Sequence, residues 1–140
     1  MSQKKSDRDW ARQTIQDAGL RATASRVATL LVLRDAAAPL SHAEVSVELE
    51  QLQIDKATVF RNLNDMVTAE ILRRSELGDH AWRFEIVTEE DHQHPHFFCV
   101  DCGSVSCMHD LELTSKNKKA RRQLGQVTEI LLRGHCADCG

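Results

Sequence analysis

The sequence predicts an α+β fold in two parts, an N-terminal winged helix–turn–helix followed by a small αβ domain. Two observations lead to this prediction. Four helical segments are followed directly by two short strands, with the turn composition Gly78-Asp79 between them. All five cysteines then lie in the last 42 residues, and four of them form two C-x-x-C pairs. The expected boundaries are 1–88 for the first part, 89–96 for a hinge and 97–140 for the second part.

Length and composition limit the number of domains and the class of protein. The chain has 140 residues, enough for one compact domain or two small ones, and its 41% apolar and 28% charged residues are ordinary for a folded protein. Its longest mostly apolar run, 27–33, is far shorter than the roughly 20 residues that cross a bilayer, and residues 1–10 are polar, unlike a signal peptide. We expect a cytoplasmic protein with no membrane partner.

The net charge of −3 gives no general case for nucleic-acid binding. The two halves differ, however, because residues 1–75 hold 11 basic and 10 acidic side chains, whereas residues 76–140 hold 7 and 11. Any surface that faces DNA is therefore expected in the first half, as a local patch.

Each of the four expected helices has its own start or stop signal. The helices are expected at about 7–18, 24–37, 42–52 and 56–67. The signal residues are Gly19 after the first helix, Thr23 and Pro39 around the second, the capping box Ser41 and Glu44 before the third, and Asp55 before the fourth.

Beyond the fourth helix the pattern changes to short strands. The expected elements are strands at 71–74 and 81–87, which form the wing, then strands at 97–100 and 105–108, a helix at 111–124 and a strand at 126–134.

The fourth helix is the candidate DNA-reading element, because the second helix of a winged helix–turn–helix enters the major groove. Arg61 suits guanine, and Phe60 or the Thr58 methyl suits thymine methyl groups. Many surface helices carry the same residue types, so this prediction depends on the surrounding fold. The candidate contact residues are Lys56, Thr58, Phe60, Arg61, Asn62 and Asn64.

The two C-x-x-C pairs, Cys99 with Cys102 and Cys136 with Cys139, predict a closed structural zinc site. No export signal accompanies them, so four thiolates around a metal are favoured over two disulfides. A rubredoxin-like iron site uses the same ligands, and a redox-active C-x-x-C protein is the enzyme alternative.

A second set of donors predicts a regulatory metal site. Glu85, His94, His96 and Cys107 offer one oxygen, two nitrogen and one sulfur ligand, a set that suits tetrahedral zinc better than iron(II) or manganese(II). Solvated loop histidines and a half-buried structural Cys107 are the alternatives.

Taken together, these segments resemble the ferric uptake regulator family of bacterial metal-responsive repressors across nearly the whole chain. The resemblance is carried by residues 19–26 (GLRATASR), 57–63 (ATVFRNL), 94–103 (HPHFFCVDCG) and 134–139 (GHCADC). It implies that the second part is a dimerisation domain. It also implies a homodimer, not an enzyme, that binds palindromic, AT-rich double-stranded DNA operators once metal is bound.

By position, the resemblance implies that Arg21 is a minor-groove arm and that Phe60 and Arg61 read or position bases. It assigns the sensor ligands to Glu85, His94 and His96, joined by Cys107 where peroxide-responsive members place a carboxylate. That replacement favours a zinc-sensing repressor of metal-homeostasis genes. The alternative within the family is an iron, manganese or peroxide sensor.

Some positions depart from the family pattern. Pro39 stands where sensors often take a further histidine, which leaves His42, His80, His92 and His109 as open candidates. Phe60 replaces the usual tyrosine, and Glu70 stands where many members carry glycine.

Overall fold

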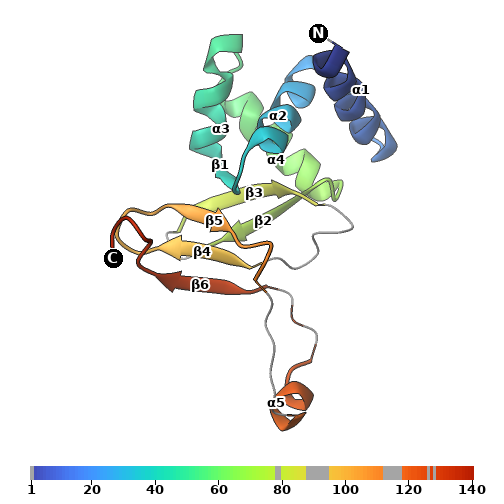
Figure 1. The fold of residues 1–140 in the computed structure, drawn as a ribbon. Coiled ribbons are helices and arrows are strands. Elements are labelled where there is room, and N and C mark those ends of the chain that lie inside the picture. Colours follow the sequence, from blue (N-terminus) through green and yellow to red (C-terminus); the bar gives the residue numbers. More distant parts are fainter. Residues whose placement is uncertain (1, 78–79, 88–94, 112–117, 126, 128) are drawn as a thin grey trace. The chain divides into compact units, whose positions relative to one another are not determined.

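The computed structural model describes residues 2–77, 80–87, 95–111, 118–125, 127 and 129–140. The chain divides into two compact units, residues 1–87 and residues 88–140, and each is described by itself. Helices and short sheets are mixed as the α+β prediction requires (Figure 1).

The first unit is a bundle of helices with a three-stranded sheet. Its elements in chain order are α1 (Ser2–Asp17), α2 (Ala24–Asp35), β1 (Leu40–Ser41), α3 (His42–Leu49), the 3-10 helix η1 (Glu50–Leu52), α4 (Lys56–Thr68), β2 (Leu72–Glu76) and β3 (Trp82–Ile86).

The helix boundaries follow the cap residues. The Thr23 hydroxyl accepts the Arg26 N–H at 3.3 Å and so starts α2. The capping box that starts α3 is complete, because Ser41 accepts the Glu44 N–H at 3.2 Å and the Glu44 carboxylate accepts the Ser41 N–H at 3.0 Å. Both caps confirm the sequence prediction. The predicted start of the first helix, near residue 7, is wrong, because α1 begins at Ser2.

One continuous apolar core lies inside the first unit. The predicted inner face of α4, with Val59, Leu63 and Met66, is fully buried. Burying a side chain of this size contributes about 1.5–3 kcal/mol, so the core fixes the orientation of α4 and leaves its opposite face outside. The buried apolar residues of this core are Ala11, Ile15, Val27, Leu30, Leu33, Val45, Leu49, Val59, Leu63, Met66, Ile71, Leu72 and Phe84.

The wing is an antiparallel hairpin with one additional strand. β2 pairs with β3 from Leu72 opposite Ile86 to Glu76 opposite Trp82. Both strands confirm the predicted wing, whereas the expected turn residues Gly78 and Asp79 lie outside the described part of the chain. The two-residue strand β1 pairs with the other edge of β3 and was not predicted, because two residues carry too little periodicity to show.

The second unit contains β4 (His96–Cys99), β5 (Val105–Cys107), α5 (Lys118–Gln123) and β6 (Leu131–Gly134). β4 lies in the centre, antiparallel to β5 and parallel to β6 (Figure 1). The predicted helix at 111–124 is too long, since the described helix covers only 118–123 and Leu111 lies in a turn closed on Met108. Most of the expected hinge, 89–94, lies outside the described residues, and His96 already belongs to β4.

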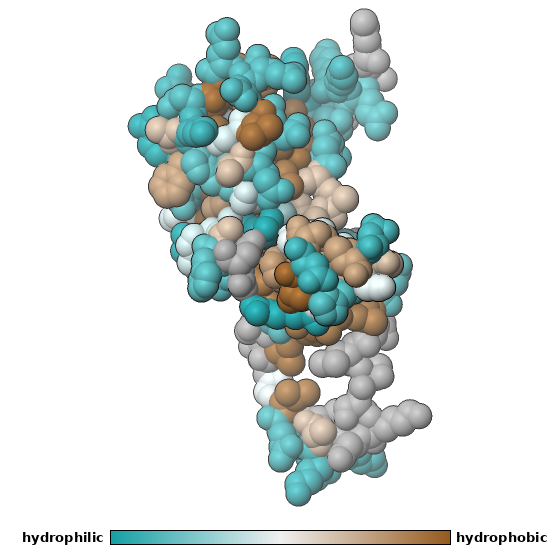
Figure 2. Space-filling view, turned by 90° about the vertical axis from the view of Figure 1, so that its left-hand side faces the viewer, coloured by the Kyte–Doolittle hydropathy of each residue, from teal (hydrophilic) through white to brown (hydrophobic). Residues whose placement is uncertain are grey.

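On the face that Figure 2 shows, the described residues are mainly hydrophilic, with hydrophobic side chains in separate patches. Among the described helices, none combines the length and the apolar character that a bilayer-spanning segment needs.

Glu70, which the resemblance places where many family members carry glycine, has a left-handed backbone with φ of 63°. It follows the end of α4, and its N–H donates to the Val67 carbonyl at 3.0 Å. A side chain in this conformation costs on the order of 1 kcal/mol, because Cβ approaches the following carbonyl. The departure from the family pattern is therefore a source of local strain.

We expect Glu70→Gly to raise the free energy of unfolding of the first unit by about 1 kcal/mol, because glycine adopts a positive φ without this strain. Urea denaturation followed by circular dichroism measures the change. Glu70→Ala is the matched control: it removes the same carboxylate, keeps Cβ and should gain little. Equal stabilisation by both variants would show that charge, not backbone strain, is responsible.

Candidate metal centre and nucleic-acid interface

The four cysteines of the two C-x-x-C pairs converge at one end of the second sheet. Cys99 ends β4 and is fully buried, Cys102 lies in the turn that follows, and Cys136 and Cys139 lie in the turn after β6. Their sulfur atoms all lie within 4.8 Å of one another. Because β4 and β6 are parallel neighbours, the two turns leave the same edge of the sheet, and this brings the pairs together.

The sulfur cluster fits a tetrahedral metal ion. A zinc ion with Zn–S bonds of about 2.3 Å holds its sulfur ligands about 3.8 Å apart. The sulfurs of Cys102 and Cys136 are 3.8 Å apart, although they belong to different pairs. All five cysteines are free thiols. Four cysteines in this arrangement could hold a structural zinc, and they leave no coordination position open to a substrate.

The electrostatics of the cluster also favour a cation. The Cys102 and Cys136 N–H groups point at the Cys99 sulfur and lower the pKa of Cys99 to about 6. The Ser104 hydroxyl lowers the pKa of Cys102 in the same way. Hydrogen bonds with the Cys136, Cys102 and Cys99 sulfurs raise the pKa of Cys139 to about 12. A central dication favours the deprotonated form of all four thiols.

A second layer of contacts joins the two turns. Asp101, inside the first C-x-x-C pair, accepts a hydrogen bond from the His135 ring, which directly precedes the second pair. Such outer contacts orient the residues that hold an ion. The sequence did not indicate this pair, although the repeated C-x-D-C pattern marks the Asp101 position.

The candidate sensor residues are only partly placed. His96 and Cys107 are directly opposite each other on β4 and β5, and a His96 ring nitrogen lies within 4.8 Å of the Cys107 sulfur. His96 is 2% exposed and Cys107 is half-buried. His94 lies outside the described residues, as does His92.

Glu85 belongs to the first unit, where it lies on β3. Its carboxylate accepts hydrogen bonds from Arg73 on β2, including one from Nε at 3.1 Å, and its side chain is 11% exposed. Two further candidate histidines, His80 and His109, are exposed in the first and second unit respectively, and the His80 N–H donates to the Glu76 carboxylate at 3.0 Å.

The outer face of α4 presents the predicted DNA-contacting residues. Lys56, Phe60 and Arg61 are exposed, and Phe60 is 52% exposed despite being aromatic. The Thr58 hydroxyl donates to Asp55 at the N-cap position, which leaves the Thr58 methyl group as its available contact. This hydrogen bond lowers the pKa of Asp55.

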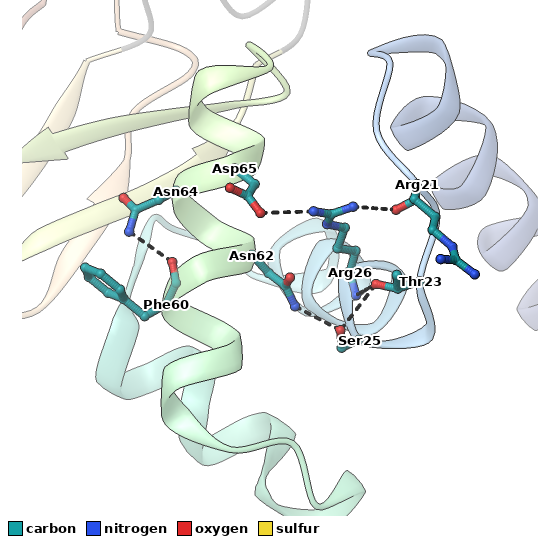
Figure 3. A network of polar contacts seen from close by, with 8 residues as sticks. All are labelled: Arg21, Thr23, Ser25, Arg26, Phe60, Asn62, Asn64 and Asp65. Carbon is teal, nitrogen blue, oxygen red and sulfur yellow. Dashed lines mark hydrogen bonds and ion pairs between the residues drawn. The ribbon is translucent and has the colours of Figure 1, made fainter.

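The expectation that Asn62 contacts DNA is wrong. Asn62 is 6% exposed, and its amide donates to the Ser25 hydroxyl at 3.0 Å, so it ties α4 to α2 (Figure 3). Asn64 is half-buried and donates to the Phe60 carbonyl at 3.0 Å within the same helix. Helical spacing alone did not distinguish Asn62, which faces the core, from the polar residues on the outer face of α4.

His42 supports the first turn of the candidate recognition helix. Its Nε2 lies 2.9 Å from the Lys56 carbonyl oxygen, and its ring packs edge-on against Phe60 with 5.4 Å between centroids. The histidine considered above as a possible sensor ligand is thus in contact with two of the predicted DNA-contacting residues. Its position at the start of α3 gave no indication of this contact, because the partner lies 14 residues further along the chain.

The comparisons with known proteins agree with this arrangement. Residues 17–131 match the ferric uptake regulator family. The chain is 33% identical to the ferric uptake regulation protein of Vibrio anguillarum over 132 residues, covering 90% of this chain and 87% of that protein. It is 32% identical to that of Bordetella parapertussis, covering 89% and 93%. The crystal structure of the Vibrio cholerae ferric uptake regulator superposes with a TM-score of 0.70 at 29% identity, covering 89% of this chain and 98% of that one.

The fold and the four-cysteine cluster define a metal-responsive transcriptional regulator with a winged-helix DNA-binding domain and a dimerisation domain. The chain belongs to the ferric uptake regulator family, whose members bind DNA and dimerise and are not enzymes. The resemblance found in the sequence is confirmed.

We expect Cys136→Ser to remove the metal from the four-cysteine site and to unfold the second unit selectively. Zinc content by atomic emission and hydrogen exchange in residues 95–140 measure both effects, because metal binding free energy at such a site is folding free energy. Cys107→Ser is the control, since it removes a cysteine outside the cluster and should keep this metal. Full protection in a metal-free Cys136→Ser protein would contradict a structural role for the ion.

We expect His42→Ala to weaken DNA binding several-fold while leaving the metal content unchanged, because the first turn of α4 loses a hydrogen bond and Phe60 loses its aromatic neighbour. Fluorescence anisotropy with operator DNA, together with metal analysis, tests this. His80→Ala, which removes an exposed histidine of the wing, is the matched control. Loss of a bound metal in the His42 variant would instead make His42 a ligand.

Proposed function

We propose that this protein is a zinc-sensing repressor of metal-homeostasis genes. It acts as a cytoplasmic homodimer that binds palindromic, AT-rich operators when its regulatory site is loaded. The proposal adds the metal, the sign of regulation and the type of operator to the established class of the protein.

The observation that carries the choice of zinc is the pairing of His96 with Cys107 across two adjacent strands. A buried imidazole and a thiol on facing positions supply one nitrogen and one sulfur donor. Thiolate favours zinc over iron(II) and manganese(II), which prefer harder ligands and higher coordination numbers. An oxygen donor at position 107 would favour the opposite choice.

We assign the regulatory site to Glu85, His94, His96 and Cys107, and the structural zinc to the four clustered cysteines. Of the four donors, Glu85 precedes the proposed hinge 89–96, His94 and His96 lie within it, and Cys107 follows it. A bound ion would therefore couple the wing to the dimerisation domain, with about 1–3 kcal/mol of improved DNA affinity as the expected size of the coupling. Glu85 enters this site with one oxygen already hydrogen-bonded to Arg73.

On the DNA side we assign Arg21 to the minor groove, and Lys56, Thr58, Phe60 and Arg61 to the major groove and the flanking phosphates. Arg21 and α4 are parts of the same unit, and the named side chains of α4 leave the core on its outer face. A cation is attracted to the narrow minor groove of AT-rich DNA, which is why the arm implies an AT-rich operator.

The second candidate is an iron- or manganese-responsive regulator, and the names of the two relatives given above favour it. A peroxide sensor is a further variant of this alternative. The relatives share about a third of their residues with this chain, which is enough to show the family but does not fix the ligand at each position.

We expect Cys107→Asp to lower the zinc sensitivity of DNA binding by at least about tenfold and to raise the response to manganese(II), because carboxylate replaces thiolate. The measurement is operator binding by anisotropy in zinc-buffered and manganese-buffered solutions. Ser106→Ala is the matched control: Ser106 is exposed on the same strand and alternates to the other face. An unchanged zinc response in both variants would exclude Cys107 as a ligand and favour the iron or manganese alternative.

A further inference from the structure

Arg26 connects the segment before α2 to the candidate recognition helix. Its Nη1 donates to the Arg21 carbonyl at 2.8 Å, and its Nη2 donates to the Asp65 carboxylate of α4 at 3.0 Å (Figure 3). The Arg26 side chain is 18% exposed, so most of it is packed against protein rather than directed at solvent. One guanidinium therefore joins the two elements to which DNA contacts are assigned.

The Arg21 end of this connection fixes the base of the arm. The Arg21 carbonyl accepts two hydrogen bonds, one from the Thr23 N–H at 3.0 Å and one from Arg26. Gly19, two residues earlier, has φ of 86°, which turns the chain out of α1 toward this position. The Arg21 backbone is thus held in place while its side chain stays exposed.

The Asp65 end lies on the same helix as the proposed base contacts. Asp65 is four residues after Arg61, which puts the two side chains one turn apart on neighbouring parts of the helix surface. Its carboxylate is 48% exposed and would repel DNA phosphates if it were unpaired. Arg26 neutralises it and holds it toward α2.

A separate contact already ties the same two helices together. The Asn62 amide donates to the Ser25 hydroxyl at 3.0 Å, next to the apolar core that α2 and α4 share. The packing of α2 against α4 therefore does not depend on Arg26. What Arg26 adds is a connection from the outer face of α4 to the base of the arm.

We propose that Arg26 is a positioning residue for DNA recognition: it fixes the Arg21 arm relative to α4, so that the minor groove and the adjacent major groove are read together. The inference rests on the proposed role of Arg21 as the minor-groove arm. An arm held in place before binding loses less conformational freedom on binding than a mobile one, and the difference appears as affinity.

Arginine suits this role and lysine does not. The planar guanidinium reaches a carbonyl and a carboxylate at once through two different nitrogens, whereas a lysine ammonium is a single point charge on a flexible chain. Arg26→Lys therefore keeps the positive charge and removes the double connection. A residue that only contacted phosphate would tolerate this substitution.

The test is a double-mutant cycle between Arg21→Ala and Arg26→Lys in the full-length, metal-loaded protein. The probe is a palindromic AT-rich duplex selected from random sequence by the wild-type protein, and binding is measured by anisotropy at several salt concentrations. In the wild-type background we expect Arg21→Ala to weaken binding about tenfold. In the Arg26→Lys background we expect less than about a twofold effect, because the arm is no longer held. The slope of affinity against salt should be the same for Arg26→Lys and the wild type.

Arg34→Lys is the matched control. Arg34 lies at the other end of α2 and pairs with Asp7 at 3.4 Å, away from the DNA-contacting elements. In its background Arg21→Ala should still cost about tenfold. Urea denaturation confirms that each protein is folded.

The outcomes separate the inference from the proposed function. If Arg21→Ala weakens binding equally in the wild-type and Arg26→Lys backgrounds, Arg26 does not position the arm, although the arm assignment stands. If Arg26→Lys lowers the salt slope, Arg26 contacts phosphate directly and the inference is wrong. If Arg21→Ala has no effect in the wild type, the arm assignment fails and this inference fails with it.

Discussion

The convergence of four cysteine sulfurs is the constraint on which the second unit depends. The four sulfurs lie within 4.8 Å of one another, and hydrogen bonds with the other three raise the pKa of Cys139 to about 12. The unit has little else to stabilise it, because Pro95, Phe98 and Cys99 are its only buried apolar side chains among the described residues. Small units with so small a core are usually stabilised by a metal ion, disulfides or association with a partner. A metal ion in the cluster and association with a partner are the stabilising contributions that fit a family of metal-responsive regulators that dimerise.

The parallel strand pair β4 with β6 lies between the four-cysteine cluster and the proposed regulatory residues His96 and Cys107. It ends at Cys99 and Gly134, from which the two cysteine turns leave, and it begins at His96, which lies opposite Cys107 on β5. The two candidate metal sites therefore share a strand only four residues long. On the proposed assignment, an ion held by the four cysteines would also help to fix the position of His96.

The sequence was most informative where the determining residues are close together in the chain. The capping box of Ser41 with Glu44 and the two C-x-x-C pairs are local patterns with a direct physical meaning, and they located α3 and the metal cluster. Contacts between distant segments were not visible. The partners Arg26 and Asp65 are 39 residues apart, and nothing in the periodicity of either helix indicates that they meet. The strain at Glu70 also needed the structure, because only the backbone angle reveals it.

The charge on the outer face of α4 depends on the hydrogen-bond and ion-pair partners of the carboxylates there. The net charge of −3 gives no long-range attraction to DNA, so affinity has to come from a few cations placed on one surface. Two aspartates lie on or next to the outer face of α4, and each has a partner: Asp55 accepts from Thr58, and Asp65 accepts from Arg26. Lys56 and Arg61 remain exposed on the same helix. This part of the surface is therefore locally positive although the protein is acidic overall, because Arg26 neutralises Asp65 and the charges of Lys56 and Arg61 together outweigh that of Asp55.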